Sequence, residues 1–297
     1  MVKNVHETVV EPTTKQKKSS LFKQTMKRLF TNKGAVIGLV VFLIIVFLSV
    51  FAPLIAPYGY TDMDIASRFA APSKDHLFGC DSMGRDIFSR ILYGGRYSLQ
   101  IGIIASGCAA IMAVFIGSAA GYFGGKVDNA LMRILDVIQA IPGMLLSIAI
   151  SAVLGNGLYE TIIALAIGNV STMSRILRGS ILTVRKSEYI DAAVVDNSSN
   201  LRIIRKHILP NSISPLIVQI TMGCAHVILV AASLSFIGLG VQPPEPEWGA
   251  MLSAGRSYIR DYPHMTLFPG IAIMLTVLSL NLLGDGLRDA LDPKQKR

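Results

Sequence analysis

Long apolar stretches alternate with short charged segments along most of this chain. Four stretches without Asp, Glu, Lys or Arg contain 28, 29, 23 and 20 residues, at 34–61, 97–125, 137–159 and 265–284. A fifth such stretch covers 212–241. An α-helix needs about 20 apolar residues to cross the roughly 30 Å hydrocarbon core of a bilayer. The pattern therefore predicts five membrane-spanning helices.

A sixth span is predicted from a weaker stretch. Residues 161–174 provide only 14 uncharged positions, which also fits a short re-entrant segment. We favour a full span, because the arginines that follow can extend their charged groups to the membrane interface. The predicted fold class is an all-α integral membrane protein with six transmembrane helices, at about 34–56, 97–122, 137–154, 158–178, 212–240 and 265–285.

Composition supports this class, and the charge distribution orients the chain. The 297 residues are 52% hydrophobic and only 16% charged, whereas soluble domains are about 25% charged. Of the 28 Lys and Arg residues, 21 fall on one side of the predicted membrane. Loops rich in Lys and Arg face the cytoplasm. We therefore expect cytoplasmic termini, with 1–33 and 179–211 cytoplasmic and the loop 57–96 extracytoplasmic, and we expect membrane lipid rather than nucleic acid around the chain.

No motif indicates catalysis, metal binding or nucleotide binding by this chain. There is no HExxH, and Gly125-Lys126 lacks the residues that a phosphate-binding loop requires. The three cysteines form no CxxC pair. Acidic residues, which ion-coupled carriers often place within the membrane, are absent from the middles of the spans. We expect neither an enzyme nor a metal site, and an energy source outside this chain. A secondary transporter is a weaker alternative.

Two features inside the predicted spans could serve transport. Polar groups within a bilayer usually face the bundle interior or an aqueous cavity. One face of the fifth span carries candidates for lining a pathway, although they could equally bond to neighbouring helices: Gln219, Met222, His226 and Ser233. In the third span, Pro142-Gly143 predicts a kink, which is either a hinge or only a bend.

A polar segment between the fourth and fifth spans predicts two short helices joined by a turn. Ser187 is the expected cap of the first helix, and Asn197 suits the left-handed conformation that ends it. In the second helix, Leu201, Ile204 and Ile208 are expected on one side, and Leu209-Pro210 is expected to stop the helix. Such a hairpin is either a docking element or an ordinary solvated loop.

The extracytoplasmic loop predicts an interfacial helix before the second span. Asp81 is the expected cap, and Asp86 and Arg90 are spaced to form an ion pair across one helical turn. An apolar face would be made by Ile87, Phe88, Ile91 and Leu92. This helix could lie where an extracytoplasmic protein docks, or it could only seal the rim of the bundle.

Four segments resemble one family. Asp191-Ala192-Ala193, then Asn197 after three residues, then Leu209-Pro210, resembles the EAA loop of bacterial ABC importer permeases, with Asp191 and Asn197 in place of the usual Glu and Gly. Three further segments are similar to the dipeptide/oligopeptide/nickel permeases, at 78–99, 235–252 and 281–294. Cys80 replaces the usual threonine. The chain is therefore identified as a member of this family, resembling its C-type permease subunit.

The resemblance implies a type I ABC importer permease fold over 34–297, in a bacterial inner membrane. It implies a homologous six-span partner, two cytoplasmic ATPase subunits that bind ATP and Mg, an extracytoplasmic binding protein, and no cofactor on this chain. Peptides are the expected cargo, with nickel as the alternative. The residues implied in coupling to the ATPases are Glu188, Tyr189, Asp191, Ala192, Ala193, Asn197, Leu209 and Pro210.

Overall fold

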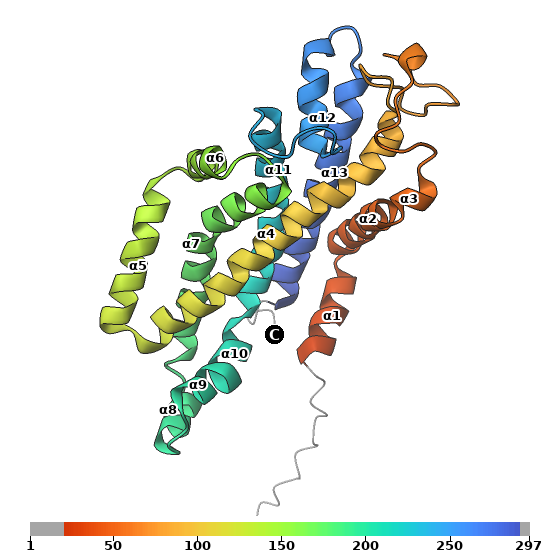
Figure 1. Ribbon diagram of the computed structural model, residues 1–297. Helices are drawn as coiled ribbons and strands as arrows, with labels where there is room; N and C mark the ends of the chain where they lie inside the picture. Colours follow the sequence, from red (N-terminus) through yellow and green to blue (C-terminus); the bar gives the residue numbers. More distant parts are fainter. Residues whose placement is uncertain (1–20, 292–297) are drawn as a thin grey trace, which may run out of the picture.

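The computed structural model describes residues 21–291, and their regular elements are helices (Figure 1). The predictions for 1–20 and 292–297 lie outside the described residues. In chain order the elements are α1 (Leu21–Thr31), α2 (Lys33–Val50), α3 (Ala52–Ile55), the 3₁₀ turn η1 (Ile65–Ser67), α4 (Ile87–Phe123), α5 (Gly125–Ala140), α6 (Gly143–Leu154), α7 (Leu158–Val184), α8 (Glu188–Val195), α9 (Asn200–Ile203), the π-helical turn η2 (Ile204–Ile208), α10 (Leu209–Ser212), α11 (Ser214–Phe236), α12 (Trp248–Gly255), the 3₁₀ turn η3 (Arg256–Tyr258) and α13 (His264–Leu291).

The long helices form one bundle with two different ends (Figure 1). α4 runs obliquely across the whole bundle and packs along α7, α11 and α2. The polar hairpin, residues 188–212, lies at one end together with α1 and the last turns of α13. We call this the hairpin end. Residues 57–86 and α12 lie at the opposite end, which we call the loop end.

Four of the described helices are long and apolar enough to cross a membrane, namely α2, α4, α11 and α13. α5 and α6 add a fifth crossing if the bent pair is counted as one span. α7 occupies the predicted fourth span and has 27 residues, but Glu160, Arg175 and Arg178 make it less apolar than those four. The described helices thus account for four or five crossings, and a sixth stays a prediction.

Two predicted spans are broken at prolines. α2 ends at Val50 rather than near residue 56, and Pro53 lies in the separate turn α3. The predicted third span is divided between α5 and α6, whose axes differ by 86°. Pro142 stands at this break and cannot donate the hydrogen bond that would continue α5. The predicted kink is therefore a sharp change of direction, and the helix before it begins at Gly125, well before the predicted start of the span near residue 137.

α4 begins at Ile87 rather than near residue 97, so the prediction of a separate interfacial helix is wrong. The apolar face predicted for that helix continues in register into the span. Asp86 is the N-cap, and its carboxylate accepts a hydrogen bond from the Ser89 amide at 2.7 Å. Asp81, the expected cap, instead closes the preceding turn by accepting from the Arg85 amide at 3.0 Å and the Arg85 guanidinium at 2.7 Å.

The predicted ion pair between Asp86 and Arg90 is replaced by contacts with other segments. Asp86 lies 3.0 Å from Nδ1 of His76, and Arg90 donates to the Tyr60 carbonyl at 2.7 Å. The Arg90 guanidinium also approaches Asp81, at 3.8 Å. Asp81, Asp86 and Arg90 are almost fully buried, and His76 is partly buried. The start of α4 is thus held by a compact cluster of charges that neutralise one another.

Small residues bring α4 and α7 together toward the hairpin end. A methyl group on Gly117 would lie 2.9 Å from the Ser174 carbonyl oxygen, and one on Gly121 would lie 2.7 Å from the Ile181 side chain. Neither contact is possible without displacing a helix, so glycine permits this approach. Leu177 is fully buried in the resulting interface.

Aromatic stacking attaches the long loop to the bundle at the loop end. The Phe69 ring stacks on Tyr262 with centroids 4.4 Å apart, and Phe78 stacks on Phe268 at 4.1 Å. Cys80 is fully buried beside this layer. Burial, reinforced by the neighbouring carboxylates, raises the pKa of the Cys80 thiol to about 11. The loop is therefore an ordered layer packed on α12 and α13.

Candidate functional site

The polar hairpin has the turn that its sequence predicts. Asn197 adopts a left-handed conformation with φ of 55°. Its amide donates to the Val194 carbonyl at 3.0 Å, and the Ser198 amide donates to the Ala193 carbonyl at 3.2 Å. These two bonds form a Schellman motif, which satisfies the last carbonyls of α8. Ser187 is the N-cap of α8 as predicted, but its side chain makes no capping hydrogen bond.

The second half of the hairpin does not stop at Leu209-Pro210, contrary to the prediction. Helical backbone continues from Asn200 to Ser212 through one π-helical turn. The Leu209 amide donates to the Ile204 carbonyl, five residues back. Pro210 lacks an amide hydrogen and would crowd the carbonyl of Lys206 in a regular α-helix. The wider π turn accommodates the proline without ending the helix.

The outward face of the hairpin carries exposed apolar side chains among charged ones. Val195 is 86% exposed, Leu201 73% and Tyr189 45%. The three residues predicted on one side of the second helix differ in burial, since Leu201 is exposed, Ile204 half-buried and Ile208 buried, and Ile203 is buried as well. Ala192 is exposed, whereas Ala193 is half-buried against the core. The exposed members of the implied coupling set are Glu188, Tyr189, Asp191, Ala192, Asn197 and Pro210, and Leu209 is half-buried.

The inward face of the hairpin belongs to the core of the bundle. Ile190, Ile203 and Ile208 share one buried cluster with Leu177 and Ile181 of α7. The hairpin is therefore packed onto the spans as one body, and it is not a separate solvated loop.

A hydrogen bond also attaches the hairpin to α4. The hydroxyl of Tyr122, at the end of α4, donates to Oδ1 of Asn200 at 2.8 Å. The guanidinium of Arg185 lies 5.8 Å from the centre of the Tyr122 ring, within the range of a cation–π contact. The first residue of α9 is thus connected to the end of the longest helix.

A cavity of about 420 Å³ brings most of the predicted pathway residues together. It is lined by Gln219, Met222 and His226 of α11 and by Pro142 and Gly143 at the α5–α6 break. Ser233, the fourth residue of the predicted polar face, does not line it, and its hydroxyl donates to the Leu229 carbonyl one turn back.

Four further polar residues of this cavity, Ser171 among them, were missed by sequence reasoning. Gln139 of α5 and Asn169 and Thr172 of α7 line it from the other side. Each interrupts an otherwise apolar stretch, and this was the available signal. The Ser171 hydroxyl lies 3.3 Å from Oε1 of Gln139 and joins the two helices at the cavity wall.

The cavity lining is polar but carries no fixed charge. Amide, hydroxyl and imidazole groups alternate with apolar side chains, and no Asp, Glu, Lys or Arg lines it. Such groups can form hydrogen bonds with the amide groups of a solute. They provide no charged partner for charged side chains of that solute. His226 is the single residue of the lining with a strong metal-ligating atom. Among the described residues, no group of three or more His, Cys, Asp or Glu side chains could hold a metal ion.

Comparison with known proteins assigns the family. Residues 113–297 match the family described as the binding-protein-dependent transport system inner membrane component. This chain belongs to that family. Residues 20–72 also match the N-terminal TM domain of oligopeptide transport permease C. The resemblance drawn from the motifs is therefore confirmed. The chain is a permease subunit, a multi-pass protein of the inner membrane that is not itself an enzyme, and ATP is hydrolysed by separate subunits.

Curated relatives align over nearly the whole chain. The dipeptide transport system permease protein DppC of Alkalihalophilus pseudofirmus is 47% identical over 277 residues, covering 93% of this chain and 91% of the relative. The glutathione transport system permease protein GsiD of Escherichia coli (strain 536) is 46% identical over 273 residues, covering 88% and 87%.

Solved structures support the fold. In an inward-facing crystal form of the MetNI methionine ABC transporter, one chain matches with a TM-score of 0.56 at 17% identity. The match covers 68% of this permease and 97% of that chain. A second crystal form of the same transporter gives a TM-score of 0.53. The permease therefore has the fold of an ABC importer membrane subunit.

Proposed function

We propose that this permease forms half of the translocation pathway of an ATP-driven peptide importer. The observation that carries the proposal is the uncharged polar cavity between α5, α6, α7 and α11, with Gln139, Asn169, Gln219 and His226 in its wall. The shared feature of diverse peptides is the backbone amide, which amides and hydroxyls can bond. A wall without fixed charge admits peptides of differing side-chain charge. The names of the relatives, a dipeptide and a glutathione permease, agree with such cargo.

Nickel is the alternative cargo within the family, and the cavity chemistry does not favour it. Nickel sites in proteins draw on several imidazole, thiolate or carboxylate ligands. The cavity offers one imidazole, that of His226, and no thiolate or carboxylate. A secondary transporter is also disfavoured, since the family draws its energy from separate ATPase subunits.

The polar hairpin is proposed as the surface on which an ATPase subunit docks, with ATP and Mg bound by that partner. Apolar side chains such as Val195 and Leu201 are exposed outside the predicted spans, and covering them gains about 25 cal/mol per Å² of apolar surface. Arg202, Arg205 and Lys206 are exposed beside Leu201, and Glu188, Asp191 and Asp196 are exposed in and directly after α8, near Val195. The inward face of the hairpin packs on α7, so a displacement of the hairpin would reach the cavity wall.

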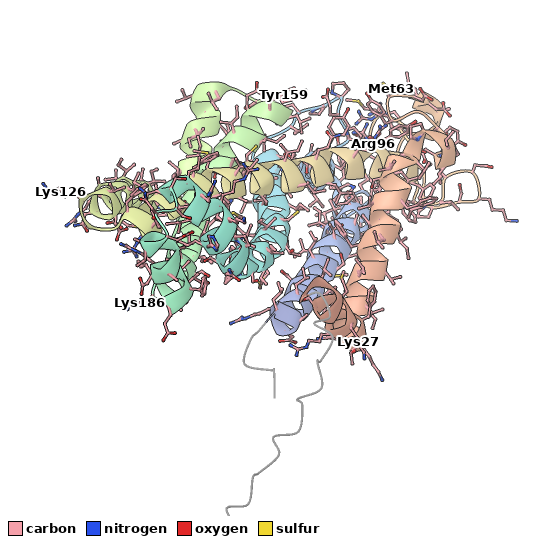
Figure 2. The ribbon with its side chains drawn as sticks, turned by 90° about the horizontal axis from the view of Figure 1, so that it is seen from below. Lys27, Met63, Arg96, Lys126, Tyr159 and Lys186 are labelled. Atoms are coloured by element: carbon pink, nitrogen blue, oxygen red, sulfur yellow. The ribbon has the colours of Figure 1, made fainter. Side chains whose placement is uncertain are left out.

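The proposal includes the orientation and the remaining partners. Lys27, Lys126 and Lys186 lie around the margin of the hairpin end, seen directly in Figure 2. This agrees with a cytoplasmic hairpin end and with the predicted cytoplasmic termini. A homologous permease subunit would complete the pathway as a heterodimer, and an extracytoplasmic binding protein would deliver cargo at the loop end.

Reconstitution tests the proposed function. The permease, its partner subunit and the two ATPase subunits are assembled in proteoliposomes with the binding protein. We expect ATP-dependent accumulation of a labelled dipeptide, stimulation of ATP hydrolysis by the loaded binding protein, and no accumulation driven by a proton or sodium gradient alone. Accumulation of Ni²⁺ but not of any peptide would overturn the cargo assignment, and uptake without ATP would overturn the importer mechanism.

A further inference from the structure

α5 is a helical segment set between two backbone joints. At its start, Gly124 and Gly125 both have left-handed φ values, of 65° and 53°. At its end, the chain turns by 86° into α6 through Ile141 and Pro142. In Figure 1, α5 stands at the side of the bundle and connects the far end of α4 to α6. A helix bounded by two such joints can change its angle as a unit, because the dihedral changes concentrate in the joints.

The apolar packing that holds α5 is sparse. Leu135 is its only fully buried residue. On the outer face, Ile134 is 58% exposed and Val137 is 72% exposed. Little of the helix is therefore committed to the core of this subunit.

Two ion pairs connect α5 to α7. Nη2 of Arg175 lies 2.6 Å from Oδ1 of Asp136. Farther toward the hairpin end, Arg178 makes a bidentate contact with Asp128, in which Nε and Nη2 each reach one carboxylate oxygen. Bidentate pairs of this kind are geometrically specific as well as attractive. These ion pairs add to the Ser171 hydrogen bonds and the buried Leu135 in holding the side of α5 that faces α7.

The Arg175–Asp136 pair lies immediately beyond the cavity on both helices. On α5, Gln139 lines the cavity and Asp136 is one turn closer to the hairpin end. On α7, which runs in the opposite direction, Thr172 lines the cavity and Arg175 is one turn closer to the hairpin end. The pair therefore closes the seam between α5 and α7 directly below the cavity.

Arg175 is incompletely satisfied in this arrangement. Its Nε is buried and has no hydrogen-bond partner. A buried donor without a partner raises the free energy of the conformation that contains it. The closed position of Arg175 is consequently easier to leave than that of a fully bonded arginine.

We propose that Arg175–Asp136 and Arg178–Asp128 form a latch on the α5–α7 seam, and that cargo leaves the cavity toward the hairpin end when this latch opens. The proposal rests on the proposed function, which supplies the cargo and the direction of movement. Opening requires α5 to turn about its two joints while α7 keeps its packing on α4. The latch residues are positioning residues for passage and need not bind the cargo.

Cross-linking tests whether the seam must open. Asp136→Cys and Arg175→Cys are combined in a chain whose Cys80, Cys108 and Cys224 are replaced by Ala, and the assembled complex is treated with a short bifunctional thiol reagent containing a disulfide. We expect cross-linking to lower ATP-dependent peptide uptake more than 10-fold and reduction of the reagent to restore it. A complex that imports at the unlinked rate when fully cross-linked would overturn the latch.

A matched control links two helices that are not expected to separate. Asn32 of the α1–α2 junction donates to Asp289 of α13 at 3.2 Å, so Asn32→Cys with Asp289→Cys can be linked by the same reagent. We expect this link to leave at least half of the uptake. Equal loss of uptake in both linked complexes would overturn the proposal, because it would trace the loss to general stiffening of the bundle.

Charge variants test the latch without a reagent. Asp136→Asn should raise ATP hydrolysis in the absence of the binding protein about 2- to 5-fold, the range that a partly exposed ion pair can supply. The exchange Asp136→Arg with Arg175→Asp should return it toward the original rate. A residue that only supports folding would instead lower assembly, and the exchanged pair would not restore coupling.

Failure of the proposed function has a different signature. If the unmodified complex hydrolyses ATP on addition of the binding protein but imports no peptide, the cargo assignment is wrong. In that case the cross-link between residues 136 and 175 should still lower the stimulated ATP hydrolysis more than 10-fold, because the latch requires α5 to move during the cycle. Stimulated hydrolysis that is unchanged by the 136–175 link overturns the latch whatever the cargo.

Discussion

Two groups of side chains at opposite ends of this permease, the charged cluster at the start of α4 and the apolar side chains of the polar hairpin, differ in whether the chain itself buries them. At the loop end, charged residues are buried and matched within the chain: Asp81 with Arg85, Asp86 with His76, and Glu247 with the Ser98 hydroxyl at 3.1 Å. At the hairpin end, Val195 and Leu201 stand in the open. The buried charges at the start of α4 are satisfied by contacts within the chain, whereas the exposed apolar side chains of the polar hairpin would be covered only by another molecule. Variants at the two ends should therefore fail differently, by loss of stability at one and by loss of coupling at the other.

The largest effect is expected at the loop end. Asp81→Ala leaves Arg85 and Arg90 buried without their carboxylate, and an uncompensated buried charge costs about 3–5 kcal/mol. We expect a much lower yield of folded permease and a lower midpoint of thermal unfolding in detergent. Wild-type stability of Asp81→Ala would show that this end is not held by its charges, and the contrast between the ends would disappear.

At the hairpin end, Leu201→Arg should uncouple the complex without unfolding the permease. Leu201 is exposed, so the substitution creates no internal clash, but it places a charge within the proposed docking face. We expect stimulated ATP hydrolysis to fall about 10-fold, equivalent to about 1.4 kcal/mol, with an unchanged unfolding midpoint. Leu201→Ala is the control and should lose less. Full stimulation in Leu201→Arg would remove the hairpin as a docking surface.

Two changes at one alanine pair sharpen the same contrast. Ala192 is exposed and Ala193 is half-buried against the core. Ala192→Arg should lower stimulated hydrolysis alone. Ala193→Arg should also lower stability, by about 1–3 kcal/mol, because it overpacks the inner face. Measuring thermal unfolding and ATP hydrolysis for both variants separates effects on docking from effects on folding. Equal losses of stability in the two variants would show that both alanines are packed against the core.

Asn197 tests the turn of the hairpin with a smaller effect. Asn197→Val should cost about 1–2 kcal/mol, since a branched side chain resists a left-handed conformation, and it should reduce coupling in proportion. Asn197→Gly should retain both stability and hydrolysis, because glycine adopts this conformation readily. Equal behaviour of the two variants in the hydrolysis assay would show that the Schellman turn does not matter for coupling.

The smallest effect is expected at Tyr122. Tyr122→Phe removes only the hydroxyl that bonds Asn200 and preserves the ring beneath Arg185. The loss of one hydrogen bond costs about 0.5–1.5 kcal/mol. We expect a modest rise in the amount of ATP hydrolysed per peptide imported, with normal assembly. An unchanged ratio would mean that the connection between α4 and the hairpin carries no coupling.

Local patterns predicted the features that depend on local physics. The apolar stretches located the long helices, and Asn197 identified the left-handed turn because few other residues adopt it. The face of α11 that carries Gln219, Met222 and His226 followed from helical spacing and does line a cavity. These features depend on neighbours within one or two turns, which a sequence displays directly.

Features set by distant partners could not be predicted in this way. Arg178 finds Asp128 at a separation of 50 residues, and Arg175 finds Asp136 at 39. The opposite wall of the cavity, with Gln139 and Asn169, depends on how far the chain turns at Pro142. The start of α4 was misplaced for the same reason, since Asp81 bonds within its own turn and Asp86 takes the capping position. In each case several local partners were available, and packing selected among them.

α4 has 37 residues without an internal break, which at 1.5 Å per residue gives a rod roughly 55 Å long. The hydrocarbon core of a bilayer is only about 30 Å thick. α4 is therefore longer than the core is thick, and it runs obliquely across the bundle from the buried charges at the loop end to Tyr122 at its other end (Figure 1). Because α4 is oblique and is held near both ends, a small lateral displacement of one end would rotate the whole helix. The loop end and the Tyr122 end of the bundle are therefore connected by one continuous helix, without a joint between them.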